Sequence, residues 1–293
     1  MKKTITIIIM AVMIFGLGGY ICYDKFYTKE ETKGKEETTE KTEVKDITTS
    51  ELALKLEKSL ISLEPDKGNV YGLYFDEDVT IDNIDAKEIL PYVLINYAKD
   101  KGIKFVNNIH YDNNVYTYYD SEDEVATLSE VEKYAKTLFG KEISFDMTNI
   151  TMVSLYGGTT AVYYVDGAFH FGYRSSSGAG YSLVNKLQKA EQKGDYIYIY
   201  DTATFCANGS GGADCSRAVD TDYTQYIVTC SVYEEDENSC SKLIGSEFES
   251  SSIQKKLANY TLENLSDKLN NYKHTFKKYN DGNYYWISSE IVK

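Results

Sequence analysis

The stretch that decides the fold is GDYIYIY, residues 194–200, in which Tyr and Ile alternate strictly. Successive side chains of a strand point to opposite faces of a sheet, so this stretch predicts a strand with Ile on one face and Tyr on the other. Leu183 to Lys193, just before it, is predicted to form a helix that ends at Gly194. After a glycine-rich interval, Tyr223 to Tyr233 resumes the strand pattern.

Two Asp-Gly pairs predict β-hairpins. Asp166-Gly167 separates the strand-like residues 159–165 from 168–174, and Asp281-Gly282 separates 272–279 from 283–288. Asp-Gly is favoured in two-residue hairpin turns because its residues tolerate positive φ.

The remaining periodic segments predict helices. These segments are 48–63, with a capping box at 48–51; 85–101, ending at Gly102; 127–139, with a capping box at 127–130 and Gly140 as a left-handed C-cap; and 261–270. Helices come first, and strands interrupted by single helices follow. This order predicts an α+β fold, with helices packed on a curved antiparallel sheet that carries the two Asp-Gly hairpins.

The N-terminus predicts membrane attachment. Lys2 and Lys3 precede residues 4–23, a stretch of twenty without charge that is long enough to span the hydrocarbon core of a bilayer. The positive-inside rule then places the N-terminus in the cytoplasm and the C-terminal region outside, as a single-pass protein of the cell membrane. Two alternatives also export the chain: a cleaved signal peptide, and a lipoprotein modified at Cys22, which the bulky residues before that cysteine disfavour.

Composition divides the chain further. Residues 1–27 are predicted as the transmembrane anchor and residues 28–50, rich in Thr, Lys and Glu, as a disordered charged stalk. Residues 51–293 are the predicted extracytoplasmic α+β region, with a sub-boundary near 120–126. The net charge of −14 and the pI near 4.8 argue against nucleic-acid binding.

Four cysteines follow the anchor: Cys206, Cys215, Cys230 and Cys240. In an oxidising compartment an even number predicts disulfides. The spacing favours Cys206–Cys215 and Cys230–Cys240, and the two crossed pairings remain open. The segment from Cys206 to Cys215 is then a surface loop closed by a disulfide. A zinc site is disfavoured because no short-spaced cysteine pair or nearby histidine is present.

Hydrolase signatures are weak, and we assign no catalytic or cofactor-binding residue. Ser210 lies next to Gly211 in a glycine-rich run, but Gly209 replaces the acidic residue that precedes a serine-protease nucleophile, and nothing in the sequence brings His110 or His170 to it. A cysteine–histidine pair of Cys206 or Cys215 with His274 is no better supported. His170 and His274 are predicted as ordinary strand residues.

Metal signatures are also weak, and we assign no metal ligand. Asp120, Glu122 and Glu124 have the alternate spacing of a calcium loop, but Val125 takes the place of its glycine. Asp214, Asp220 and Asp222 offer no better set, so these acidic residues are predicted to be solvated turns.

Aromatic residues provide the candidate binding surface. Tyr196, Tyr198 and Tyr200 share one strand face, and Tyr284, Tyr285 and Trp286 cluster near the end of the chain. Such rings either fill a sheet or stack on sugars and peptides. We expect a non-enzymatic binding, adhesion or envelope-accessory module with an unknown protein or glycan partner; a cell-envelope hydrolase with an unrecognised site is the alternative.

Three motifs carry a resemblance: Leu138-Phe139-Gly140-Lys141, residues 194–200, and Thr275-Phe276-Lys277-Lys278 before an Asp-Gly turn. Together they resemble uncharacterised membrane-anchored surface proteins of low-GC Gram-positive bacteria, many from the gut. The resemblance spans most of residues 50–293. It implies the same compartment and a cystatin-like or nuclear-transport-factor-like α+β core, and it implies no catalytic residue.

Overall fold

The computed structural model describes residues 43–63, 70–105, 109–112, 115–118, 125–155, 160–173, 181–209, 211–217, 226–233, 237–245 and 253–292. Contacts group Glu43–Lys293 as one compact unit. The predicted anchor at residues 1–27, the first part of the predicted stalk and most of the predicted sub-boundary at 120–126 lie outside the described residues. No helix within the described residues is long and apolar enough to cross a membrane.

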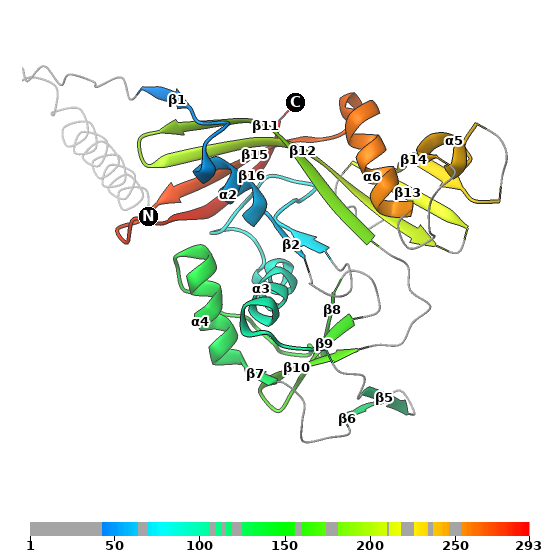
Figure 1. Ribbon diagram of the computed structural model, residues 1–293. Helices are drawn as coiled ribbons and strands as arrows, with labels where there is room; N and C mark the ends of the chain where they lie inside the picture. The colour runs from blue at the N-terminus through cyan, green and yellow to red at the C-terminus, as the bar shows by residue number, and fades with distance from the viewer. Residues whose placement is uncertain are drawn as a thin grey trace, which may run out of the picture. The chain divides into compact units, whose positions relative to one another are not determined.

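The main sheet is antiparallel and has eight strands, in the order β1-β11-β12-β15-β16-β4, with β13 pairing with both β12 and β14 (Figure 1). Its strands are β1 (Val44–Asp46), β4 (Val79–Thr80), β11 (Tyr181–Lys193), β12 (Tyr196–Gly209), β13 (Gly212–Ser216), β14 (Tyr226–Ser231), β15 (Asn271–Lys278) and β16 (Tyr284–Val292). The last residues that the sequence assigns to the stalk belong to the fold instead, because Val44–Asp46 pair with β11 and Ile47 is buried.

The prediction of a helix from Leu183 to Lys193 is wrong. These residues belong to β11, which pairs with β12 from Tyr181↔Ala207 to Lys193↔Tyr196, and Gly194 lies in the hairpin turn with a φ of 59°. Spacings of four and three residues between apolar side chains suggested a helix. Pairing along the whole of β12 outweighs that weak preference, because tertiary context decides secondary structure when local propensity is small.

The described residues of the glycine-rich interval after Tyr200, 201–209 and 211–217, belong almost entirely to the sheet and not to an irregular loop. Strand β12 continues to Gly209 and turns back as β13, so Cys206 and Cys215 are register partners with Cα atoms 4.1 Å apart. Both predicted disulfides are present, Cys206–Cys215 and Cys230–Cys240. The prediction that the first lies on a surface loop is wrong, since both of its cysteines are fully buried.

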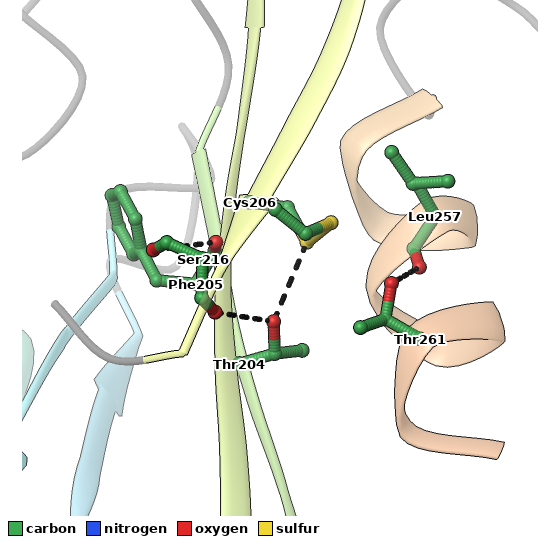
Figure 2. Close-up of a disulfide and its surroundings, with 7 residues drawn as sticks. Thr204, Phe205, Cys206, Ser216, Leu257 and Thr261 are labelled. Atoms are coloured by element: carbon green, nitrogen blue, oxygen red, sulfur yellow. Dashed lines mark hydrogen bonds between the residues drawn. A yellow bond between two sulfur atoms is a disulfide. The ribbon is translucent and has the colours of Figure 1, made fainter. Parts of the chain in front are cut away.

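Two helices cover the disulfides: α5 (Cys240–Ile244) and α6 (Ile253–Asn264). Figure 2 shows α6 beside Cys206, with Leu257 and Thr261 on the helix and Thr204 on the strand. The half-cystines form a small apolar core with Ile253, Leu257 and Ala258. Helix α6 begins and ends earlier than the predicted 261–270, and a short 3-10 helix at Ser266–Lys268 follows it.

The N-terminal helices are α2 (Glu51–Ser59), α3 (Ala86–Lys101) and α4 (Leu128–Phe139). Helices α3 and α4 confirm the predictions: Gly102 and Gly140 are left-handed C-caps, and Thr127 forms the capping box with Glu130. Helix α2 is shorter than predicted. Its N-cap is Ser50, its C-cap is Leu60, and Ile61–Leu63 form a strand.

Smaller sheets complete the fold. A four-stranded sheet has the order β7-β10-β9-β8, and two hairpins pair β2 with β3 and β5 with β6. The strands are β2 (Ile61–Leu63), β3 (Val70–Gly72), β5 (Ile109–Asp112), β6 (Val115–Tyr118), β7 (Val125–Thr127), β8 (Met152–Ser154), β9 (Thr160–Val165) and β10 (Ala168–Tyr173). The predicted Asp166-Gly167 hairpin joins β9 to β10, and both turn residues have positive φ.

One large core joins helices α2, α3 and α4 to both larger sheets. Its buried members include Leu56 of α2, Val93 of α3, Phe139 of α4, Phe169 of β10 and Ile199 of β12. The protein is thus an α+β fold whose helices pack against antiparallel sheets, as predicted.

Candidate functional site

The inward face of β12 carries a charged residue into the core. The alternation that buries Ile197 and Ile199 continues to Asp201 and Ala203, and all four side chains are buried. A buried carboxylate needs partners, because removing it from water without hydrogen bonds costs several kcal/mol.

Those partners come from three other segments. Asp201 Oδ1 lies 3.2 Å from His274 Nε2 on β15, and both side chains are fully buried. The other oxygen, Oδ2, accepts hydrogen bonds from the Tyr74 hydroxyl and, at 2.9 Å, from the Asn185 amide on β11. Ser289 of β16 extends the network, since its Oγ lies 2.7 Å from His274 Nδ1.

The hydrogen bonds of Ser289 determine whether His274 Nδ1 carries a hydrogen. Ser289 Oγ donates its one hydrogen to the Leu73 carbonyl at 2.8 Å and accepts from Trp286 Nε1 at 3.0 Å. The contact with His274 Nδ1 therefore needs a hydrogen from the ring. His274 Nε2 and Asp201 Oδ1 then share one further proton, so that every contact of the network is satisfied.

The network extends to helix α2 through Glu57. Partial burial raises the pKa of Glu57, the charge of Asp201 raises it further, and a hydrogen bond with Asn185 opposes the rise. Burial also raises the pKa of Tyr74 well above 10, and Asp201 adds to that rise. Two nearby carboxylates, one with a raised pKa, are a pattern found in acid–base catalysts.

Burial argues against catalysis here. Asp201, His274 and Ser289 are each at most 1% exposed, and the Ser289 hydroxyl is committed to the Leu73 carbonyl. A nucleophile must contact its substrate, and these atoms are buried and hydrogen-bonded to other groups of the protein. The network is therefore best understood as a polar junction that fixes β11, β12, β15 and β16 to the Leu73–Tyr74 segment.

The other hydrolase candidates gain no support. Cys206 and Cys215 form a disulfide, so neither provides a free thiolate for His274. His170 lies on β10, in the four-stranded sheet, whereas the side chains of His110 and Ser210 lie outside the described residues. The sequence reasoning missed the role of His274, which is a buried member of the network.

Tyr196, Tyr198 and Tyr200, here called the tyrosine ladder, occupy the opposite, outward face of β12. All three are half-buried, and the rings of Tyr196 and Tyr198 are parallel within 10° with centroids 6.4 Å apart. Helix α6 covers this face of β12 only farther along, at Thr204 and Cys206.

A lysine lies over each ring of the ladder. The Nζ atoms of Lys277, Lys273 and Lys189 lie 5.7, 5.1 and 5.8 Å from the ring centroids of Tyr196, Tyr198 and Tyr200, respectively. Opposite residues on paired strands share a face, so Lys193 and Glu191 of β11 also border the ladder. Glu191 pairs with Lys189, and Glu290 of β16 pairs with Lys273.

The predicted aromatic surface divides into two parts. Trp286 is 2% exposed and packs against Phe139 at 5.9 Å between ring centroids. Tyr284 is half-buried on the same inward side, where its hydroxyl accepts from Gln192 Nε2 at 3.0 Å. These two residues therefore lie on the opposite side of the sheet from the ladder.

The metal candidates gain no support from the described residues. Among the described residues, no three His, Cys, Asp or Glu side chains come together in a way that could hold a metal ion. Asp120, Glu122, Glu124, Asp220 and Asp222 lie outside those residues, and Asp214 is half-buried on β13.

Comparison with known proteins adds no identity. No protein-family model, no curated protein and no solved structure matches the chain. The resemblance to Gram-positive surface proteins and the cystatin-like or nuclear-transport-factor-like core stay predictions.

Proposed function

We propose that the protein is a non-enzymatic binding module held outside the cell membrane, and that the tyrosine ladder is its binding surface. The observation that carries this proposal is the pairing of each ladder tyrosine with a lysine on an outward sheet face. Tyrosine provides a large, rigid contact area at low entropic cost, with a hydroxyl for hydrogen bonding.

The extracytoplasmic placement has two supports. Both disulfides belong to an oxidising compartment, because cytosolic reductants keep thiols reduced. The uncharged residues 4–23 then serve as the bilayer anchor, with the cytoplasmic N-terminus on one side and a short stalk leading to β1 on the other.

The ladder suits a saccharide polymer. It lies along a strand with a rise of ~3.3 Å per residue, so alternate tyrosines repeat at about 6.6 Å along an extended line. Lys193 and Lys277, which flank it, form no ion pair with a described carboxylate. Rings, hydroxyls and ammonium groups in one row fit a hydroxyl-rich chain that carries some negative charge.

Co-sedimentation with peptidoglycan, an insoluble saccharide polymer, tests the proposal. The full-length chain should sediment with it, Tyr198→Ala should remove most of the binding, and Tyr233→Ala should not. Tyr233 is the matched control because it is 79% exposed and lies away from the ladder, after β14. Failure of the unaltered chain to sediment, or equal loss in both variants, would contradict the proposal.

The alternative, a cell-envelope hydrolase, has a histidine–carboxylate cluster in its favour. Asp201 and His274 are both completely buried, so that cluster presents neither side chain to a substrate. The binding module is therefore the better-supported function.

A further inference from the structure

A cleft of about 330 Å³ opens where α2, the end of α4 and the β15–β16 hairpin meet. Its buried lining consists of the apolar residues Leu56, Leu73, Phe139, Phe276 and Trp286 together with Tyr92. Its volume lies at the low end of the range for small-molecule sites, about 300–1,000 Å³. Because Trp286 faces inward, the cleft is separate from the tyrosine ladder and from the proposed function.

Most polar groups of the cleft already have partners inside the protein. The Tyr92 hydroxyl donates to the Ser59 carbonyl at 2.5 Å, and the Ser59 hydroxyl donates to the Leu56 carbonyl at 2.6 Å. The Tyr285 hydroxyl donates to Asp281 at 2.6 Å. None of these three hydroxyl hydrogens is free for a ligand.

Two hydrogen-bond donors of the cleft remain without an acceptor among the described residues. Lys55 forms no ion pair there, although it lines the cleft. The Tyr284 hydroxyl accepts from Gln192, but its own hydrogen has no described acceptor. Asp281, at the hairpin tip, is satisfied by Tyr285 and by the Asn283 backbone N–H at 2.9 Å.

The cleft thus combines an apolar lining with one unpaired cation and one spare hydroxyl donor. We propose that it binds a small carboxylate with an aromatic or similarly apolar body. The body replaces water against Phe139, Phe276 and Trp286, and the carboxylate accepts hydrogen bonds from Lys55 and Tyr284. Charge-assisted hydrogen bonds of this kind are roughly twice as strong as neutral ones.

Trp286 provides a local readout. It is the only tryptophan of the chain and lines the cleft, so its fluorescence reports occupancy. Phenylbutanoate is a suitable probe, because its phenyl ring absorbs little where tryptophan is excited. Phenylbutanol is its uncharged analogue, and butanoate lacks the ring.

The experiment titrates the full-length chain with each compound and follows Trp286 emission. Phenylbutanoate should give a saturable change, and phenylbutanol should bind about tenfold more weakly. Butanoate should give no change at the same concentrations. Equal affinity for the acid and the alcohol, or no saturable change with phenylbutanoate, would overturn the proposal.

Variants on α2 separate the cleft lysine from general charge effects. Lys55→Met keeps the apolar stem and should remove the preference for phenylbutanoate over phenylbutanol. Lys58→Met should keep that preference, because Lys58 is exposed on the same helix, as Lys55 is, but does not line the cleft. Tyr284→Phe should reduce the affinity for phenylbutanoate several-fold. The same loss in Lys58→Met as in Lys55→Met would sink the assignment.

Discussion

Replacing Ser289 with Ala should destabilise the protein by roughly 3–6 kcal/mol. The hydroxyl satisfies three buried groups: the Leu73 carbonyl at 2.8 Å, Trp286 Nε1 at 3.0 Å and His274 Nδ1 at 2.7 Å. Each buried group left without a partner costs about 1–3 kcal/mol. The estimate takes the lower half of that range for all three, since small shifts relieve part of the cost.

Ser288→Ala is the matched control. Ser288 is the preceding residue on β16 and is only 7% exposed, but its side chain forms no hydrogen bond among the described residues. Its replacement should cost below about 1 kcal/mol. Urea unfolding followed by Trp286 emission measures both variants, with the slope of the transition unchanged. If the two variants differ by less than about 1 kcal/mol, the network does not stabilise the fold as argued.

Three further predictions concern other elements. Gly140→Ala should lower the free energy of unfolding in urea by about 1–3 kcal/mol more than Gly102→Ala. Both C-caps have a φ near 70°, but only at Gly140 would a Cβ lie 2.6 Å from the Tyr285 ring. Equal losses would refute this. Glu57→Gln should raise stability at neutral pH, and its gain should vanish below the ordinary glutamate pKa of 4.5. The pKa of Glu57 is raised in the folded state, so its ionisation is penalised there and not in the unfolded chain. The stability of the unaltered protein therefore falls as the pH rises. A gain that persists in acid would contradict this assignment. Reduction of the two disulfides, which close loops with separations of 9 and 10 residues, should lower the free energy of unfolding by about 2.5 kcal/mol each; unchanged unfolding in reductant would contradict it.

Elements specified by short local signals could be predicted from the sequence. The capping box at Thr127 needs only four residues, and the structure has the Thr127 N–H donating to the Glu130 carboxylate at 2.8 Å. Gly140 ends the same helix because its φ of 70° is disfavoured for other residues. The Asp166-Gly167 turn is equally local. In each case the conformation is determined by the same few residues that adopt it, so tertiary packing only needs to be compatible with it.

The strand β11 shows where local signals fail. Its Leu, Lys, Gln and Glu residues favour a helix slightly, and Gly194 suits a helix end as well as it suits a hairpin turn. What makes it a strand is its pairing with β12, which is a tertiary fact. The same pairing extends β12 beyond Tyr200. Because the sequence does not reveal this pairing, it also predicts a loop where β12 and β13 form a disulfide-bonded hairpin.

Predicting the buried network from the sequence would have required the register of the strands. The alternation of residues 194–200 continues to Asp201 and places that carboxylate on the inward face, so the sequence contains the signal that Asp201 needs a partner. It does not say which of the chain's three histidines provides it, because His274 is 73 residues away. The choice follows from register: β15 sets His274 opposite Ile199, one inward position before Asp201 on β12. The register depends on the whole sheet. The sequence around Asp201 therefore shows that this carboxylate needs a partner, but it does not show which residue the partner is.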